Sequence, residues 1–309
     1  MILLSSFYLP SFTAETNNQQ ETLQRRKNAI LVDGVILNGP VADSEAGEKF
    51  VEEATKIIME EVIKKAADVT EKVCEWHPPE KLKTLLDLEL KDIGENHQKL
   101  LQFCRDVIKF SVKTRQDHPR FFNQLYAGID YYSLAARFTT EALNPSVYTY
   151  EVSPVFLLVE EAVIKKMIEF LGWEEGDGIF NPGGSVSNMY AMNLARYKYC
   201  PEVKEMGLSG MPRLVLFTSD ECHYSVKKAA SFLGIGTQNV YFIKSDERGK
   251  MIPEELEKQV LRARKEGSAP FFVSATSGTT VLGAFDPLDE IANICEKYGL
   301  WLHVDVSSF

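Results

Sequence analysis

The first sustained pattern of apolar residues in this sequence begins near Glu48. Apolar side chains then recur three and four positions apart, which predicts an amphipathic helix with acidic and lysine side chains outward; they are Phe50, Val51, Ala54, Ile57, Ile58 and Val62. A second helix is predicted after Pro78-Pro79, and a third over about residues 97–114. The third carries an apolar stripe of Leu100, Leu101, Cys104, Val107, Ile108 and Val112.

A long helix is expected after Ser153-Pro154. Ser153 can cap this helix with its hydroxyl, and proline suits the first helical turn. Apolar residues then repeat at helical spacing: Val155, Leu158, Val159, Val163, Met167 and Phe170.

Short β-favouring runs replace the helical period in the last third of the chain. They lie at residues 214–217, 240–243, 271–273 and 301–304, separated by helical patterns near residues 223–233, 253–266 and 287–298. Strands that alternate with helices form a mostly parallel sheet with helices on its faces. The sequence therefore predicts an α/β fold for this part of the chain.

Composition and charge narrow the possible partners. With 45% hydrophobic and 25% charged residues, the chain has an ordinary globular composition. A net charge of −10 and a pI near 5.2 oppose nucleic-acid binding, because phosphate backbones repel an acidic surface. The five cysteines form no CxxC pair, which favours reduced thiols in a cytoplasmic protein and no metal site. No run approaches the roughly 20 apolar residues of a membrane span, so no membrane partner is expected.

Two glycines and a hydroxyl stand at a predicted helix start. Gly183, Gly184 and Ser185 precede a helical run that extends to about Tyr199. Backbone N–H groups at a helix start bind phosphate, and glycine lets a ligand approach closely. The same three residues also suit a plain turn and cap, so this segment alone leaves both interpretations open.

Further polar residues follow the predicted strands. His223 comes after the first strand and can stack on an aromatic ligand or cap the helix that begins near Ser225. Residues 277–280 place hydroxyls and a glycine after the third strand, and Asp305 closes the fourth. Because parallel strands end at one edge of a sheet, we expect these groups to lie together.

This combination matches the needs of pyridoxal phosphate. The cofactor needs donors for its phosphate, a flat group over its ring, and a carboxylate that keeps the pyridine nitrogen protonated. A Rossmann-type nucleotide-binding protein is a poorer match, because no GxGxxG opens a first strand–helix unit.

Longer segments resemble the group II pyridoxal-phosphate decarboxylases, from about residue 48 to Asp305. They are similar to the branch that acts on acidic amino acids, which includes the glutamate and cysteine sulfinic acid decarboxylases. The segments that carry this resemblance are Phe122–Leu125, Asp177–Phe180, Pro182–Gly184, Ser187–Met189, Leu214–Ser219, His223–Ser225, Gly278–Thr280, Gly283–Pro287 and Trp301–Asp305.

The resemblance implies the aspartate aminotransferase-like large domain of fold type I pyridoxal-phosphate enzymes. Residues 129–309 would form this cofactor-binding domain, and residues 48–128 would form a helical N-terminal region used for dimerisation. Residues 1–47 lack a sustained period and are expected to form a disordered tail. The family's subunits are expected to pair as homodimers in the cytoplasm.

The resemblance also assigns roles to single residues. Gly184 and Ser185 would contact the phosphate, and Thr280 would lie near the cofactor. His223 would stack on the pyridine ring, while Asp305 would bind the ring nitrogen.

A loop would contact the acidic side chain of the substrate through Gln124, Leu125 and Tyr126. The Gln124 amide can donate to a carboxylate or sulfinate. Tyr126, bulkier than the serine usual in glutamate decarboxylases, would shorten the pocket. Aspartate, cysteine sulfinate and cysteate are therefore expected over glutamate, with β-alanine, hypotaurine and taurine as products. Glutamate decarboxylation, or a loop that only packs at a domain junction, are the alternatives.

Family members continue past the aspartate to an Asn-Pro-His-Lys segment, whose lysine forms the Schiff base, and to a C-terminal small domain. Here Asp305 is followed by Val306-Ser307-Ser308-Phe309. We therefore expect a truncated form that is inactive alone. The alternative to an enzyme is a non-catalytic isoform that pairs with full-length decarboxylase subunits.

Overall fold

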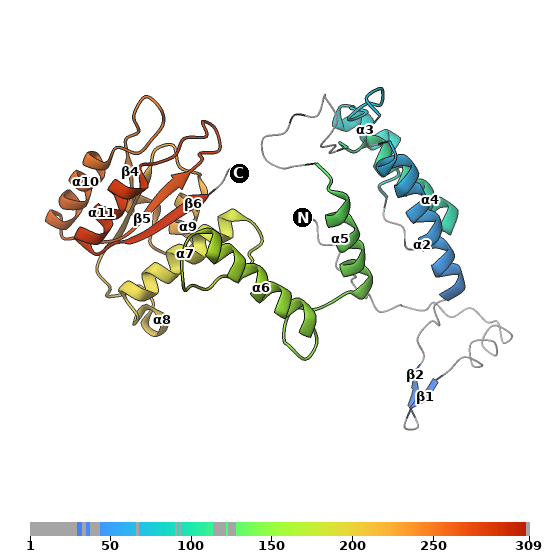
Figure 1. The fold of residues 1–309 in the computed structure, drawn as a ribbon, viewed down its shortest axis with the longest axis horizontal. Coiled ribbons are helices and arrows are strands. Elements are labelled where there is room, and N and C mark those ends of the chain that lie inside the picture. The colour runs from blue at the N-terminus through green and yellow to red at the C-terminus, as the bar shows by residue number, and fades with distance from the viewer. Residues whose placement is uncertain are drawn as a thin grey trace. The chain divides into compact units, whose positions relative to one another are not determined.

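The computed structural model describes residues 30–32, 35–37, 44–65, 68–89, 92, 94–113, 122 and 128–306. Contacts divide the chain into two compact units, residues 1–139 and residues 140–309 (Figure 1). Most of the tail predicted to be disordered, residues 1–47, lies outside the described residues. The exceptions are the start of the first helix and an antiparallel pair of short strands, β1 (Ile30–Val32) and β2 (Val35–Leu37).

The first unit is helical, as its apolar period predicts. Its elements are α2 (Ser44–Ile58), the π-helical turn η1 (Met59–Ile63), α3 (Pro79–Leu85), α4 (His97–Phe110) and the first part of α5 (Tyr131–Leu143). Helix α2 packs against α4. Each buries one apolar side chain, Ile57 in α2 and Leu101 in α4. Asn96 caps α4 by accepting a hydrogen bond from the backbone N–H of Lys99 at 3.0 Å.

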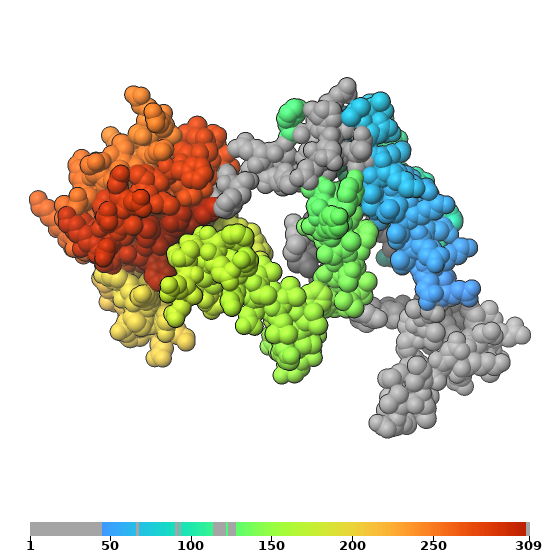
Figure 2. Space-filling view, viewed as in Figure 1, coloured from blue at the N-terminus to red at the C-terminus, as the bar shows by residue number. Residues whose placement is uncertain are grey.

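Helix α6 (Pro154–Phe170) belongs to the second unit and has proline in its first turn. Ser153 occupies the predicted N-cap position, and its carbonyl accepts from the backbone N–H of Leu157 at 3.2 Å, but it makes no side-chain cap. At φ −150° and ψ 59°, its backbone departs from usual cap geometry, and its hydroxyl makes no capping hydrogen bond. The apolar stripe of α6 is exposed, from 42% at Val163 to 82% at Phe170. Figure 2 shows the yellow-green segment that contains α6 at the surface of this view. Among the described residues, no helix is both long enough and apolar enough to cross a membrane.

A four-stranded parallel sheet forms the centre of the second unit, with the strand order β4–β3–β5–β6. Its strands are β3 (Leu214–Ser219), β4 (Val240–Ile243), β5 (Ala269–Ser277) and β6 (Trp301–Val306). Every residue of β3 and β5 is buried, because these two strands lie between neighbours and under helices. The predicted parallel α/β architecture is confirmed.

Helices cover both faces of this sheet (Figure 1). Helices α7 (Gly184–Tyr199) and α9 (Ser225–Phe232) pack on one face, and α10 (Pro253–Lys265) and α11 (Leu288–Tyr298) on the other. Two short elements follow helices in the chain: α8 (Val203–Met206) lies between α7 and β3, and η2 (Thr237–Asn239) lies between α9 and β4. Side chains alternate along a strand: Leu214 and Leu216 of β3 enter the core with α7 and α9, whereas Val215 and Phe217 enter the core with α10 and α11.

Candidate functional site

The chain leaves two neighbouring strands toward opposite faces of the sheet. Strand β3 leads into α9 on one face, whereas the adjacent β5 leads into α11 on the other. In open α/β sheets, ligands bind outside the carboxyl ends of the strands where such a divergence occurs. His223 follows β3, residues 278–280 follow β5, and Asp305 lies near the end of β6. The sequence thus correctly predicts that these groups lie at one edge.

Helix α7 begins at Gly184 with its first turn open to solvent. Gly183 has φ +98°, a conformation that side chains other than hydrogen rarely allow. A Cβ atom placed on Gly183 or Gly184 would meet no heavy atom within 4 Å, and both Gly184 and Ser185 are exposed. The first N–H groups of a helix have no acceptor within it. The start of α7 can therefore bind an anion.

Asn188 links helix α7 to Ser225 at the start of α9 and to strand β6. It lies one turn into α7 and is only 4% exposed. Its amide nitrogen donates to Oδ2 of Asp305 and to Oγ of Ser225, both at 2.9 Å. Its carbonyl oxygen lies 2.7 Å from Nε2 of His303, which shares one face of β6 with Asp305. Since Oγ of Ser225 lies 2.7 Å from Nδ1 of His223, side-chain hydrogen bonds join Asp305 to His223 without a break.

His303 is held as a neutral ring in this network. Burial lowers the pKa of His303, and the negative charge of Asp305 opposes this shift only in part. The ring stacks on Phe272 with a centroid distance of 5.8 Å and an interplanar angle of 21°. The ring therefore serves as a fixed hydrogen-bond group at this edge.

The turn after β5 is ordered by buried hydroxyls. Thr279 is 2% exposed, and its Oγ1 accepts a hydrogen bond from the backbone N–H of Ala284 at 3.1 Å. Thr280, the next residue, is half-buried. Thr276 pairs in register with Asp305, and its buried hydroxyl has no hydrogen-bond partner within the described part of the chain. A ligand at this edge can supply the missing partner.

Asp286 fastens the same turn to the sheet. Its Oδ1 accepts from the backbone N–H of Met251, and its Oδ2 accepts from the backbone N–H of Thr276, both at 2.7 Å. Burial raises the pKa of Asp286, and these two hydrogen bonds offset the shift only in part. The carboxylate is thus costly to bury and is held by two backbone donors.

A thiol also lies at this edge. Burial raises the pKa of Cys222, and the negative charge of Asp305 raises it further. Because the thiolate is the reactive form of cysteine, this thiol is a poor nucleophile.

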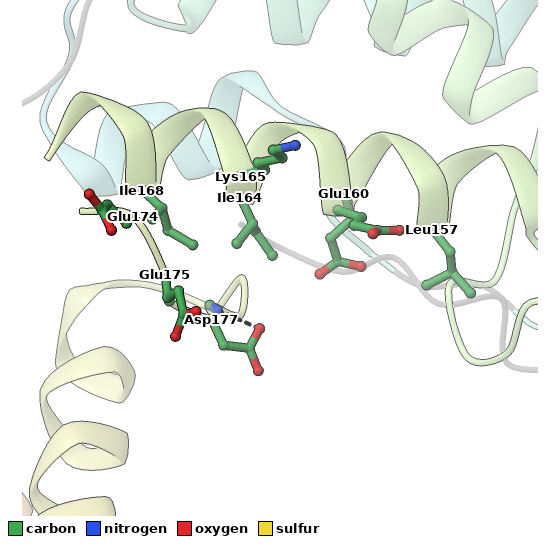
Figure 3. A pocket seen from close by; sticks show the side chains of 11 residues that line it. Leu157, Glu160, Ile164, Lys165, Ile168, Glu174, Glu175 and Asp177 are labelled. Atoms are coloured by element: carbon green, nitrogen blue, oxygen red, sulfur yellow. Dashed lines mark hydrogen bonds between the residues drawn. The ribbon is translucent and has the colours of Figure 1, made fainter. Parts of the chain in front are cut away.

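A surface groove lies away from these residues, between α6 and residues 174–178 (Figure 3). Its volume is about 550 Å³. The charged side chains that line it are Glu160, Glu161, Lys165, Glu174, Glu175 and Asp177. With five carboxylates and one lysine, it repels anions. It therefore suits neither a phosphate nor an acidic substrate.

The sequence predicts some of the residues that lie at this edge of the sheet but not others. It placed Gly184, Ser185, His223, Thr280 and Asp305 there. The predicted substrate residues 124–126 lie outside the described residues. Four residues that hold the edge together received no role from the sequence: Asn188, Ser225, His303 and Asp286. The alternation of His303 with Asp305 along β6 was the available signal, since such residues share a face.

Comparison with known proteins identifies the family of this chain. Residues 79–308 match the pyridoxal-dependent decarboxylase conserved domain. The chain belongs to this family. Acidic amino acid decarboxylase of Homo sapiens is 78% identical over 290 residues, which cover 94% of this chain and 55% of that protein. Cysteine sulfinic acid decarboxylase of Rattus norvegicus is 58% identical over 265 residues, which cover 86% of this chain and 53% of that protein.

A solved relative gives the same picture of the fold. The crystal structure of mouse CSAD in apo form matches with a TM-score of 0.81 and 57% identity, over 85% of this chain and 55% of that one. The chain therefore spans about half the length of the relatives it matches. The fold is part of the fold type I large domain that the motifs predict, preceded by helices. Proteins of this pyridoxal-dependent decarboxylase family are carboxy-lyases, and their cofactor is pyridoxal phosphate.

Proposed function

We propose that this decarboxylase-family protein removes carbon dioxide from small acidic amino acids, with pyridoxal phosphate as cofactor. One observation carries the proposal: a strand-end carboxylate, Asp305, is tied by Asn188 at 2.9 Å to the helix whose open start can bind a phosphate. A carboxylate and an anion site at one sheet edge suit the two polar ends of this cofactor.

The residues at the edge fit the cofactor chemically. Open space before α7 leaves room for a phosphate at Gly184 and Ser185. The unpartnered hydroxyl of Thr276, next to Asp305 in register, is a buried polar group that a bound molecule can satisfy. When bound, pyridoxal phosphate supplies a protonated ring that accepts the electron pair left behind by departing carbon dioxide.

Each residue of the chain has a separate task in this proposal. The backbone N–H groups of Gly184 and Ser185 hold the phosphate, and the Ser185 hydroxyl adds a donor. Asp305 accepts a hydrogen bond from the pyridine nitrogen and keeps its proton in place. His223 covers one face of the ring, and Thr280 borders the cofactor.

Substrate choice is assigned to Gln124, Leu125 and Tyr126. The Gln124 amide would donate to the acidic side chain of the substrate, and the bulk of Tyr126 would favour aspartate, cysteine sulfinate or cysteate over the longer glutamate. The names of the two relatives support acidic substrates. Glutamate decarboxylation stays the alternative, and β-alanine, hypotaurine and taurine are the expected products.

Carbon dioxide release tests this proposal. The full chain is incubated with pyridoxal phosphate and, separately, with carboxyl-labelled aspartate, cysteine sulfinate, cysteate and glutamate. Release from the three shorter acids, lost in Asp305→Asn but not in the surface control Asp289→Asn, would support the proposal and overturn the expectation from the sequence that this chain is inactive alone. Release from glutamate alone would overturn the substrate assignment, and equal release by Asp305→Asn would overturn the site.

A second candidate function is pairing with a full-length decarboxylase subunit without catalysis. The observation that favours it is the uncovered apolar stripe of α6, where Val155 is 65% and Leu158 is 54% exposed. Co-purification with a tagged full-length subunit tests it, with Leu158→Lys as the disrupting variant. Absence of co-purification, or equal pairing by Leu158→Lys, counts against this function.

A further inference from the structure

We infer that Asn188 is a positioning residue that couples Asp305 to His223 and fixes the imidazole of His223 with its proton on Nε2. The inference deepens the proposed function, because it assigns the control of two cofactor-facing groups to one buried amide. It rests on hydrogen-bond directions that the network itself determines.

The side-chain amide of Asn188 is hydrogen-bonded to three other side chains. Its two N–H groups are used by Asp305 and Ser225 at 2.9 Å, and its oxygen by His303 at 2.7 Å. Since only 4% of the residue is exposed, water does not replace these partners readily. A change in the amide therefore reaches all three neighbours.

The carboxylate sets the orientation of this amide. Oδ2 of Asp305 accepts a hydrogen bond from Asn188, so the amide nitrogen of Asn188 faces the carboxyl group. The amide oxygen then faces His303, whose Nε2 must carry the proton for that contact. Because burial lowers the pKa of His303, the ring is neutral and its Nδ1 carries no proton.

The second N–H of Asn188 determines which group donates in the hydrogen bond between Ser225 and His223. It donates to Oγ of Ser225, which leaves the serine hydroxyl hydrogen free to donate to Nδ1 of His223 at 2.7 Å. The backbone N–H of Ser225 also points at this Nδ1, at 3.3 Å. Two donors aimed at one ring nitrogen require that nitrogen to be an acceptor. The ring proton of His223 therefore lies on Nε2.

This arrangement has a consequence for the cofactor. Asp305 and His223, the proposed partners of the pyridine nitrogen and the ring face, are not independent, because Asn188 and Ser225 lie between them. Asn188→Asp puts a second carboxylate against Asp305 and removes both donors. Ser225→Ala cuts only the His223 branch, and Ser225→Thr restores the hydroxyl.

Nitrogen-15 and proton NMR of the labelled full chain without cofactor tests the proton positions directly. Long-range correlations distinguish a protonated from an unprotonated ring nitrogen. Both His223 and His303 are expected to carry their proton on Nε2. A proton on Nδ1 of His223 in the unmodified chain overturns the inference, and this result needs no variant that has to fold.

The variants test the coupling. In Asn188→Asp, the signals of both histidines are expected to change; in Ser225→Ala only those of His223, with recovery in Ser225→Thr. The control is Asn193→Asp on the same helix, where the side-chain oxygen accepts from Arg196 and an aspartate still can. An Asn188→Asp spectrum with both ring states unchanged contradicts the coupling.

Titration with pyridoxal phosphate, followed by protein fluorescence, separates this inference from the proposed function. Loss of a hydrogen bond to a charged group predicts roughly 10- to 100-fold weaker binding by Asn188→Asp. If the unmodified chain binds no pyridoxal phosphate while the histidine spectra follow the network, the proposed function fails for this chain and the inference stands. If it binds and Asn188→Asp binds equally well, the inference fails and the proposed function stands.

Discussion

Replacing Asp286 by asparagine tests whether a buried carboxylate holds the turn after β5. Its two oxygens accept the backbone N–H groups of Met251 and Thr276, both at 2.7 Å, and the residue is 4% exposed. Asparagine keeps the shape but offers one oxygen, so its NH₂ group faces a backbone donor. One of the two N–H groups then loses its acceptor inside the protein.

The expected cost follows from these contacts. A hydrogen bond to a charged group contributes about 1.5–3 kcal/mol, and a buried donor left without a partner costs about 1–3 kcal/mol. Removing a buried charge returns part of this, because burial disfavours the ionised form. We expect a net loss of about 2–4 kcal/mol in the free energy of unfolding. For a unit of this size that corresponds to a fall of roughly 4–16 °C in melting temperature.

Urea unfolding at neutral pH, followed by circular dichroism, measures the change. The control is Asp289→Asn in the exposed first turn of α11, for which a change below about 1 kcal/mol is expected. An Asp286→Asn chain as stable as the unmodified one would refute the claim that this carboxylate holds the turn.

The pH dependence of the stability difference between the unmodified chain and Asp286→Asn tests the direction of the pKa shift of Asp286. Because burial raises the pKa of Asp286 above its unfolded value, the folded state holds the proton more tightly. Its contribution to stability is full below the unfolded pKa and is lost as pH rises through the folded pKa. The unmodified chain should therefore gain stability over Asp286→Asn as pH falls through that window. A stability difference that shrinks toward acid pH would contradict this reasoning.

Three further predictions follow from the site and its core. Asp305→Asn should weaken pyridoxal phosphate binding roughly 10- to 100-fold in a fluorescence titration, because the ring nitrogen loses a charged partner; unchanged affinity would remove Asp305 from the site. Burial lowers the pKa of His303, so its contribution to stability is present above the unfolded value, near 6.5, and is lost as pH falls through the folded pKa. His303→Gln should thus lose less stability than the unmodified chain between about pH 7 and 5 in urea unfolding, and parallel losses would argue against this. Burial raises the pKa of Cys295 to about 12, so native chain should resist iodoacetamide at pH 8 at this residue while urea-unfolded chain reacts; mass spectrometry that finds rapid native labelling would contradict the burial.

The sequence predicted the sheet well because its strands are short apolar runs between helical periods. The run at residues 271–273 was recognised, but β5 extends from Ala269 to Ser277. Its carboxyl half contains Ser274, Thr276 and Ser277, which interrupt the apolar pattern although all three are buried. Hydroxyls near a binding edge thus hide the end of a strand from pattern reasoning.

Other features depend on partners that lie far away in the chain. Helical spacing predicts an apolar face on α6 but contains no information on what covers it, and the structure leaves residues such as Phe170 exposed. The role of Asn188 is equally hidden, since four α-helices and three strands separate α7 from β6, the strand that carries its partners His303 and Asp305. Ser153 stands at the N-cap position of α6, yet its hydroxyl makes no capping hydrogen bond.

The hydrogen bond between Asn188 and Asp305 also has a bearing on how the chain folds. It joins residues 117 positions apart, and closing so long a loop carries a large entropic cost. In the four-stranded sheet, β6 pairs with β5, which in turn pairs with β3. Because β6 joins the sheet by pairing with β5, we expect this bond to form late in folding, once these distant segments have come together. During synthesis, α7 leaves the ribosome before β6, so we expect the side chain of Asn188 to stay solvated until β6 has been made.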